Sequence, residues 1–179
     1  MAETPKVIHI VLFEPEIPAN TGNIMRTCAA SKMVLHLIEP LGFILDDRHL
    51  KRSGMDYLDD LEMIVHDDLN HFYETMKGTC YYVTRYANRT HSDVDYLKSE
   101  GDIYLMFGKE STGIPLEILH KHQSHAVRIP MSETARSLNL SNCVAVVGYE
   151  VLRQNNYDGL SQQEVQKGPN WLNEFNHID

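Results

Sequence analysis

Short apolar runs alternate with amphipathic segments along most of the 179 residues of this chain. The runs are rich in β-branched and aromatic residues and predict buried strands over residues 7–13, 34–38, 61–65, 80–84, 103–107 and 126–129. Segments with apolar residues at helical spacing predict helices over residues 20–31, 47–52, 68–76, 115–120 and 139–153. We expect Asn20 to cap the first helix and either Asn139 or Ser141 to begin the last one. Strands that alternate with helices predict an α/β domain with a mostly parallel sheet flanked by helices.

The last predicted helix carries the longest apolar stripe of the chain, formed by Leu140, Val144, Val147, Gly148 and Val151. The stripe is broad enough that we expect part of it to be buried between two subunits. Beyond residue 156 the sequence is polar and loses its periodicity. We therefore expect one domain over residues 1–156 and a C-terminal tail of unassigned role over residues 157–179.

Composition narrows the class of protein. Apolar residues make up 42% of the chain and charged residues 23%, which is typical of globular proteins. The 16 basic and 25 acidic residues give a net charge of −9, which disfavours bulk electrostatic binding of nucleic acid but allows a local basic patch. The three cysteines lie far apart, the N-terminus has no signal-type apolar region, and no apolar run is long enough to span a membrane. These features predict a cytoplasmic protein with reduced thiols.

Several common catalytic sites are missing from the sequence. No G-x-G-x-x-G follows the first predicted strand and no G-x-S-x-G elbow is present, which disfavours a dinucleotide-binding fold and a serine hydrolase. His120, His122 and His125 lack the spacing of a zinc motif and have no cysteine nearby. We therefore predict no metal site.

Three polar loops follow predicted strands, at the edge where open parallel sheets bind their ligands. The first spans residues 13–26 and ends with Arg26 on a turn of helix. The second, residues 107–115, places Glu110 between two glycines, and the third, residues 128–142, opens the longest helix with its free N–H groups. Taken singly, each loop also fits an ordinary strand-to-helix turn. Only their order and joint content indicate a function.

Together the loops resemble a known family. The ordered motifs P-E-I-P-A-N-T-G-N-I-x-R, L-M-F-G-K-E-S-T-G-I-P, R-I-P-M and R-S-L-N-L-S-N are similar to those of the SPOUT-class RNA 2′-O-methyltransferases. The similarity runs from about Val7 to Gln154 and is greatest to the small tRNA wobble-nucleotide 2′-O-methyltransferases, the TrmL group. The chain departs from the family pattern after the fourth predicted strand, where it has Thr84-Arg85-Tyr86-Ala87 in place of T-x-K-G.

The resemblance implies a fold and a cofactor that pattern analysis alone does not predict. SPOUT domains carry a deep trefoil knot near the C-terminus, although knots are rare in proteins. The segments after Val83, after Phe107 and around residues 129–140 would form the knot and cradle S-adenosylmethionine (S-adenosyl-L-methionine). By position, the residues that bind this cofactor would be Val83, Gly108, Ile129, Ser137 and Leu138.

The implied reaction transfers a methyl group from the sulfonium of S-adenosylmethionine to a ribose 2′-hydroxyl, and it needs no metal. Catalysis requires alignment of the hydroxyl and removal of its proton. The resemblance gives Arg26 the central role, either as a base with a lowered pKa or as the ligand of a neighbouring phosphate. Asn23 and Glu110 would orient Arg26 or the nucleotide, and Ser141 or Asn139 would shape the site.

The implied substrate is cytidine or uridine 34, the wobble nucleotide in the tRNA anticodon stem-loop, and the implied assembly is a homodimer. A basic rim for the RNA would come from Arg26, Arg48, Lys51, Arg52, Lys109 and Arg136. We expect no membrane partner and no metal. Two alternatives stay open at this point: the same chemistry on another RNA such as ribosomal RNA, and a non-enzymatic RNA-binding or assembly protein with the same fold.

Overall fold

A six-stranded sheet with parallel pairing between all neighbouring strands organises the computed structural model, which describes residues 5–45 and 60–175. The strands are β1 (Ile8–Phe13), β2 (Val34–Ile38), β3 (Met63–His66), β4 (Gly78–Val83), β5 (Asp102–Phe107) and β6 (Ala126–Val127). Their order across the sheet is β3-β2-β1-β5-β4-β6. All six predicted strands are confirmed, with boundaries that shift by a few residues.

Within the described residues, four helices lie between or after these strands: α1 (Pro18–Ser31), α3 (Leu69–Thr75), α4 (Leu116–Lys121) and α5 (Leu140–Gln154). Short 3₁₀ turns at His91–Asp93, Tyr96–Lys98, Gln123–His125 and Trp171–Phe175 were not predicted. The helix predicted over residues 47–52 lies outside the described residues. Asn139 caps α5 as expected, because its side chain accepts a hydrogen bond from the Ser141 N–H.

The expectation that Asn20 caps the first helix is wrong. The helix begins two residues earlier, with Pro18 in its first turn and Ile17 at the N-cap. Proline suits this position because its ring fixes a helical φ and the missing N–H would have had no partner within the helix. Asn20 consequently lies inside α1, where it is buried.

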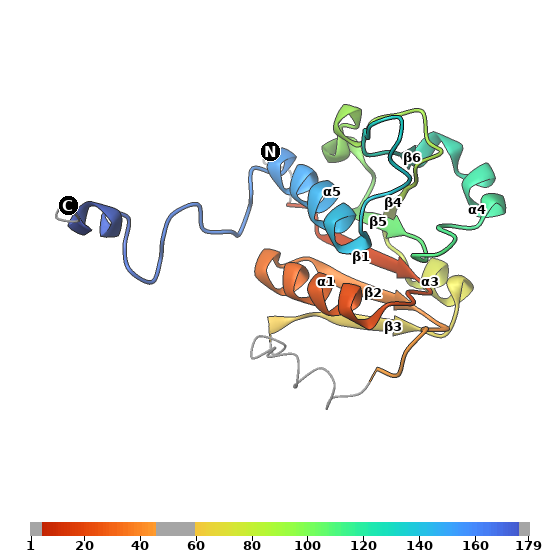
Figure 1. Ribbon diagram of the computed structural model, residues 1–179, viewed down its shortest axis with the longest axis horizontal. Coiled ribbons are helices and arrows are strands. Elements are labelled where there is room, and N and C mark those ends of the chain that lie inside the picture. Colours follow the sequence, from red (N-terminus) through yellow and green to blue (C-terminus); the bar gives the residue numbers. More distant parts are fainter. Residues whose placement is uncertain (1–4, 46–59, 176–179) are drawn as a thin grey trace.

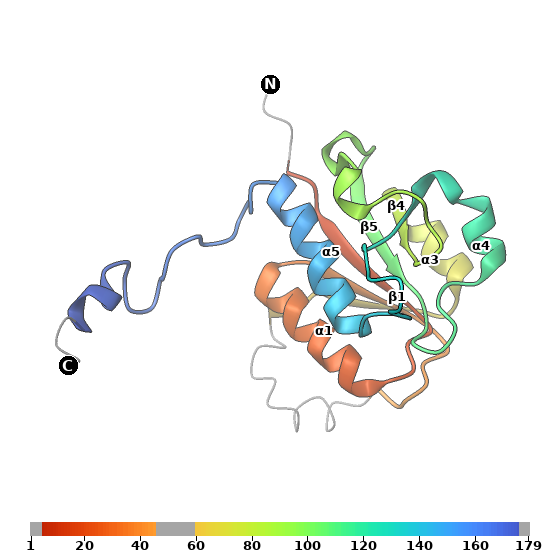
Figure 2. The same cartoon turned by 45° about the horizontal axis from the view of Figure 1, so that its top comes forward.

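The helices cover both faces of the sheet, α1 and α5 on one side and α3 and α4 on the other (Figures 1 and 2). Alternate residues of each strand point to opposite faces, so β1 contributes to two separate cores. Ile10 and Leu12 pack with residues of α1 and α5, whereas Val11 and Phe13 pack with Phe72 of α3 and its neighbours.

The apolar stripe of α5 belongs to the first of these cores. Val144, Val147 and Val151 are fully buried within the subunit, and the backbone at Gly148 approaches Met33 and Ile10. For these three valines and Gly148 the expectation of burial between subunits is therefore wrong, because α1 and the sheet already cover them, whereas Leu140 at the start of the stripe is only half-buried.

Three buried histidines form a hydrogen-bonded chain across β1, β2 and β3. His9 Nδ1 lies 2.8 Å from His36 Nε2, and His36 Nδ1 lies 2.8 Å from His66 Nε2. His9 Nε2 faces the carboxylate of Asp102 at 3.7 Å. Burial, together with the two flanking imidazoles, lowers the pKa of His36 to about 3. The central ring is therefore neutral at physiological pH.

The segments that follow β4 and β6 run side by side. Thr90 pairs with Arg128, whose N–H donates to Arg89 O at 2.9 Å. Its carbonyl accepts from His91 N, also at 2.9 Å. These contacts bring both segments to the carboxyl edge of the sheet, beside the loop after β5.

Only the first residues after α5 pack against the rest of the domain. Tyr157 and Leu160 still pack against the first core. The following residues lead away from the sheet to the short turn at Trp171–Phe175 (Figures 1 and 2). In the described part of the chain, none of the helices has the length and apolar character needed to cross a membrane.

Candidate functional site

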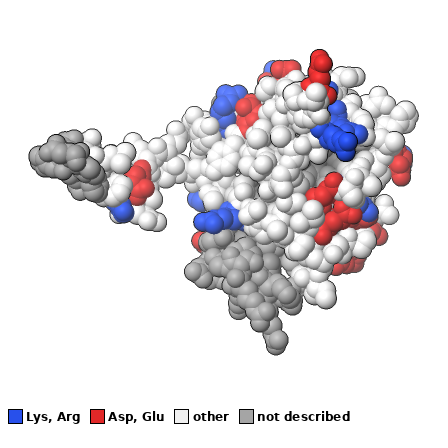
Figure 3. Space-filling view, viewed as in Figure 1, with Lys and Arg blue, Asp and Glu red and all other residues white. Residues whose placement is uncertain are grey.

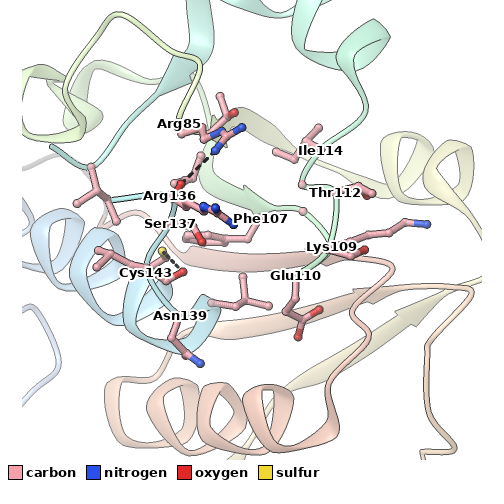
Figure 4. Close-up of a pocket in the computed structure, with 18 of the residues that line it drawn as sticks. Arg85, Phe107, Lys109, Glu110, Thr112, Ile114, Arg136, Ser137, Asn139 and Cys143 are labelled. Carbon is pink, nitrogen blue, oxygen red and sulfur yellow. Dashed lines mark hydrogen bonds between the residues drawn. The ribbon is translucent and has the colours of Figure 1, made fainter. Parts of the chain in front are cut away.

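A cavity of about 560 Å³ opens at the carboxyl edge of the sheet, where the segments after β4, β5 and β6 converge (Figure 4). We call it the first cavity. Its walls are residues 83–86 after β4, residues 107–114 after β5 and a third segment from Ile129 into the start of α5. Ile17 and Asn20 of the first loop close one side. The three loops singled out in the sequence thus meet at one place, as parallel strands require.

All five residues predicted to bind the cofactor line the first cavity: Val83, Gly108, Ile129, Ser137 and Leu138. Figure 4 draws Ser137 of the third segment and Phe107 at the end of β5 among the residues that line this cavity. Their roles toward a ligand stay predictions.

Gly108 has a structural role in the wall of this cavity. A Cβ at Gly108 would lie 2.1 Å from the backbone of Gly113 and Ile114, so no other residue fits there. Gly113 has a φ of +75°, and its N–H donates to Lys109 O at 2.9 Å. The two glycines close the loop on itself, which fixes the direction in which the residues between them point.

Glu110 connects this loop to the start of α1. One carboxylate oxygen accepts from Glu16 N at 2.8 Å, and the other accepts from Ile17 N at 3.2 Å and from Asn20 Nδ2 at 3.0 Å. In the opposite direction, Glu16 accepts from the Ser111 hydroxyl at 2.8 Å and from Ser111 N at 2.9 Å. These bonds from Ser111 lower the pKa of Glu16. The loop after β5 and the segment before α1 therefore each contribute a carboxylate, Glu110 and Glu16 respectively, that accepts hydrogen bonds from the other.

The network continues to α5 through two asparagines. Asn20 Oδ1 accepts from Asn139 Nδ2 at 2.9 Å, and Asn139 Oδ1 accepts from Ser141 N at 2.9 Å and Ser141 Oγ at 2.6 Å. Asn20 was missed as a site residue in the sequence. Its spacing from Ile24 and Cys28 places it on the buried face of the helix, and an amide on such a face needs hydrogen-bond partners.

The three other residues predicted for catalysis do not line the first cavity. Asn23 and Arg26 are exposed on α1, one turn apart. Ser141 reaches the site only through its bonds to Asn139. The subunit therefore brings Glu110, Asn20 and Asn139 together, and leaves Arg26 on its outer surface.

Basic side chains border the first cavity in small groups. Arg85 donates to Arg136 O at 3.3 Å and to the Tyr86 hydroxyl at 3.0 Å, with its guanidinium carbon 4.9 Å from the Tyr86 ring centre. Lys109 forms an ion pair with Glu14. In the view of Figure 3, Lys and Arg side chains share one face of the molecule with acidic ones. Of the predicted basic rim, Arg48, Lys51 and Arg52 lie outside the described residues.

The chemistry of the first cavity suits a ligand with a flat apolar ring and polar ends. Phe107, Ile129 and Leu138 supply apolar surface, while Thr84 and Ser137 supply hydroxyls. Within residues 5–45 and 60–175, no group of three or more His, Cys, Asp or Glu side chains is placed to hold a metal ion.

Comparison with known proteins places this geometry in context. The model of the SpoU rRNA methylase family matches residues 7–149. A protein of Listeria monocytogenes named as a tRNA (cytidine(34)-2′-O)-methyltransferase is 49% identical over 156 residues, which cover 87% of this chain and 92% of the relative.

Solved structures show the same fold. An RNA methyltransferase from Bacillus anthracis superposes with a TM-score of 0.83 at 48% identity, covering 88% of this chain and 99% of that one. A structure that addresses 2-OH methylation of C/U34 on tRNA has a TM-score of 0.77 at 39% identity, covering 86% of this chain and 99% of that one. The SpoU methyltransferase AviRb of Streptomyces viridochromogenes, in complex with AdoMet, shares the fold alone, with a TM-score of 0.72 at 20% identity over 86% of this chain and 59% of that one.

Proposed function

Because the chain belongs to the SpoU rRNA methylase family, we propose that it methylates RNA at a ribose 2′-hydroxyl. The substrate is cytidine or uridine 34 of tRNA, in the anticodon stem-loop, and the methyl donor is S-adenosylmethionine. The relative at 49% identity supports the choice of substrate, since it aligns over nearly the whole enzyme domain. The observation that carries the proposal is the convergence of all three motif loops on the first cavity.

The first cavity fits S-adenosylmethionine by the chemistry of its walls. Phe107, Ile129 and Leu138 offer apolar surface to the adenine, and the third segment lines the same cavity and would offer its peptide groups to the edge of the ring. Thr84 and Ser137 are placed to bind a polar end of the ligand. When bound, S-adenosylmethionine supplies a methyl group on a positively charged sulfur, which needs no activation by a metal.

The remaining task of the protein is to align the 2′-hydroxyl and assist loss of its proton. Glu110, Asn20 and Asn139 hold the loops that frame the cavity, so we assign them positioning roles. We assign Arg26 to the phosphate of the reacting nucleotide, because a guanidinium stays protonated and binds phosphate through two parallel bonds. Asn23, one turn away on α1, would orient Arg26.

Arg26 is exposed on α1 and does not line the first cavity of its own subunit, so we propose a homodimer in which a second subunit brings Arg26 and a cavity together. Large apolar side chains near the first cavity support it. Ile17 and Leu138 at its mouth and Val146 and Tyr149 on the outer side of α5 are each 40–44% exposed. In such a dimer, α1 of one subunit would present Arg26 to the cavity of the other.

We extend the proposal to topology and location. The pairing of residues 89–91 with Arg128 supports a trefoil knot formed by the segments after β4, β5 and β6. Residues 1–156 would then form the methyltransferase domain, and residues 157–179 a tail of separate role. Three free cysteines, two of them buried, support a cytoplasmic location.

Nucleoside mass spectrometry tests the proposed function. Purified protein and labelled S-adenosylmethionine are incubated separately with unmodified tRNA and with ribosomal RNA, and each RNA is digested and mapped. We expect a 2′-O-methyl group at nucleotide 34 of tRNA. Label in ribosomal RNA alone would identify ribosomal RNA as the substrate in place of tRNA. Label in neither RNA would favour a non-enzymatic role.

A further inference from the structure

A second cavity, of about 590 Å³, lies on the far side of the segment that follows β4. Thr84 and Tyr86 line both cavities, so this segment is the wall between them. The other boundary of the second cavity is formed by α4 and the turn after it. The side chains that define its chemistry are Tyr86, Asn88, Arg89, Leu116, His120 and Gln123.

The second cavity presents a platform for a flat ring. Tyr86 is 59% exposed and Leu116 is 66% exposed, on opposite boundaries of the cavity. The Tyr86 backbone is held by Thr84 Oγ1, which accepts from Tyr86 N at 3.3 Å, and its hydroxyl accepts from Arg85. An exposed aromatic ring that is fixed in this way loses little conformational entropy when a second ring stacks on it.

Hydrogen-bonding groups and a positive charge surround this platform. Asn88 and Gln123 carry amides that both donate and accept, and Gln123 is oriented by His120, 3.0 Å away. Arg89 donates only to the carbonyl of Asp93, at 3.2 Å, and forms no ion pair with any residue that the structure describes. Its backbone is anchored by Arg128. The guanidinium therefore keeps donors for a phosphate.

We propose that the second cavity binds a single-stranded nucleotide of the RNA substrate that neighbours the methylated one. The base stacks on Tyr86, the amides of Asn88 and Gln123 contact its edge, and Arg89 binds its phosphate. Proteins recognise RNA loops in this way, by stacking splayed bases on aromatic rings and by hydrogen bonds to their edges. The inference rests on the proposed function for the identity of the RNA.

The acidic character of the chain favours such a site. A protein with a net charge of −9 gains little from general attraction to RNA, so its affinity has to come from local contacts. A stacked base and one phosphate contact next to the first cavity supply both affinity and register. The register fixes which ribose of the loop reaches the first cavity.

Binding of a fluorescent RNA hairpin with an anticodon-loop sequence tests the site, measured by anisotropy over a range of salt concentrations. We expect Tyr86→Ala to weaken binding about 10-fold, the scale of one stacked base, and Tyr86→Phe to restore it. We expect Arg89→Ala to lower the slope of log K against log salt by about 0.7, as loss of one phosphate contact on a single strand requires. Lys98→Ala removes the same charge outside both cavities, at a residue paired with Asp95, and should leave the slope unchanged.

A series of hairpins that each lack one loop base identifies the seated nucleotide. Removal of the base at one loop position should weaken binding to the wild-type protein. The same removal should not weaken binding to Tyr86→Ala any further, because the ring on which that base would stack is already missing. The inference is overturned if Arg89→Ala keeps the wild-type salt slope, or if no abasic position distinguishes Tyr86→Ala from the wild type. Since binding is the readout, a wild-type protein that binds the hairpin without methylating tRNA overturns the proposed function and not this site.

Discussion

Replacement of Glu110 by glutamine removes one acceptor oxygen from the contact between the loop after β5 and the start of α1. The carboxylate accepts three hydrogen bonds, from Glu16 N, Ile17 N and Asn20 Nδ2. A glutamine oxygen at the position of Oε1 keeps the last two bonds but turns its NH₂ group toward the Glu16 N–H. The opposite rotamer keeps only the bond from Glu16. The best arrangement therefore keeps two neutral bonds in place of three charge-assisted ones.

The expected loss of stability follows from this count. A hydrogen bond to a charged group contributes about 1.5–3 kcal/mol, and a neutral one about 0.5–1.5 kcal/mol. One bond is lost and two are weakened, while water offsets part of the loss because the site is only partly buried. We expect the free energy of unfolding to fall by roughly 2 kcal/mol, equivalent to a Tm lower by about 4–8 °C for a chain of this length.

Urea denaturation of the wild type, Glu110→Gln and Glu117→Gln measures this loss. Glu117 is exposed on α4 and serves as the matched control, with an expected change within about 0.5 kcal/mol. A double-mutant cycle with Asn20→Ala should give a coupling energy above about 0.5 kcal/mol, because the two side chains are in contact. If Glu110→Gln is as stable as Glu117→Gln, the reciprocal contact does not hold the loops together.

Three further predictions concern the loop, the histidine chain and the reaction. Gly108→Ala should lower the free energy of unfolding by several kcal/mol in urea denaturation, since its Cβ would lie 2.1 Å from the backbone of Gly113 and Ile114. The control Gly22→Ala has open space around the new Cβ and should raise the free energy of unfolding by about 0.5–1 kcal/mol, and equal effects of the two variants would contradict the loop geometry. The pKa of His36 is lowered from 6.5 to about 3 in the folded protein, so as the pH falls the unfolded chain binds a proton at His36 before the folded protein does. Below pH 6.5 the free energy of unfolding should therefore fall by about 1.4 kcal/mol per pH unit through this group. Denaturation at pH 7 and pH 5 should show the drop in the wild type and less of it in His36→Gln; equal drops would remove His36 as the cause. Arg26→Ala should slow single-turnover methyl transfer roughly 100-fold without changing the Kd for S-adenosylmethionine, and normal transfer would exclude Arg26 from the reaction.

The sequence by itself determined the elements of this fold and the edge where the site lies. Apolar runs such as residues 34–38 and 103–107 are strands because their side chains are buried on both faces of a parallel sheet, a property that the run itself reveals. The motif loops could be placed at the carboxyl edge for the same reason, since each follows such a run directly. The cap at Asn139 was also predictable, because its partner Ser141 is two residues away.

Only the tertiary structure decided which polar groups meet. Glu110 bonds to Glu16 across 94 residues of sequence, because β5 lies beside β1 in the sheet. The same strand order brings Asn20 to Asn139, buries the stripe of α5 inside the subunit and leaves Arg26 outside the first cavity. Periodicity reports how a residue relates to its near neighbours along the chain. It carries no information on the order in which strands pair, and that order sets every one of these contacts.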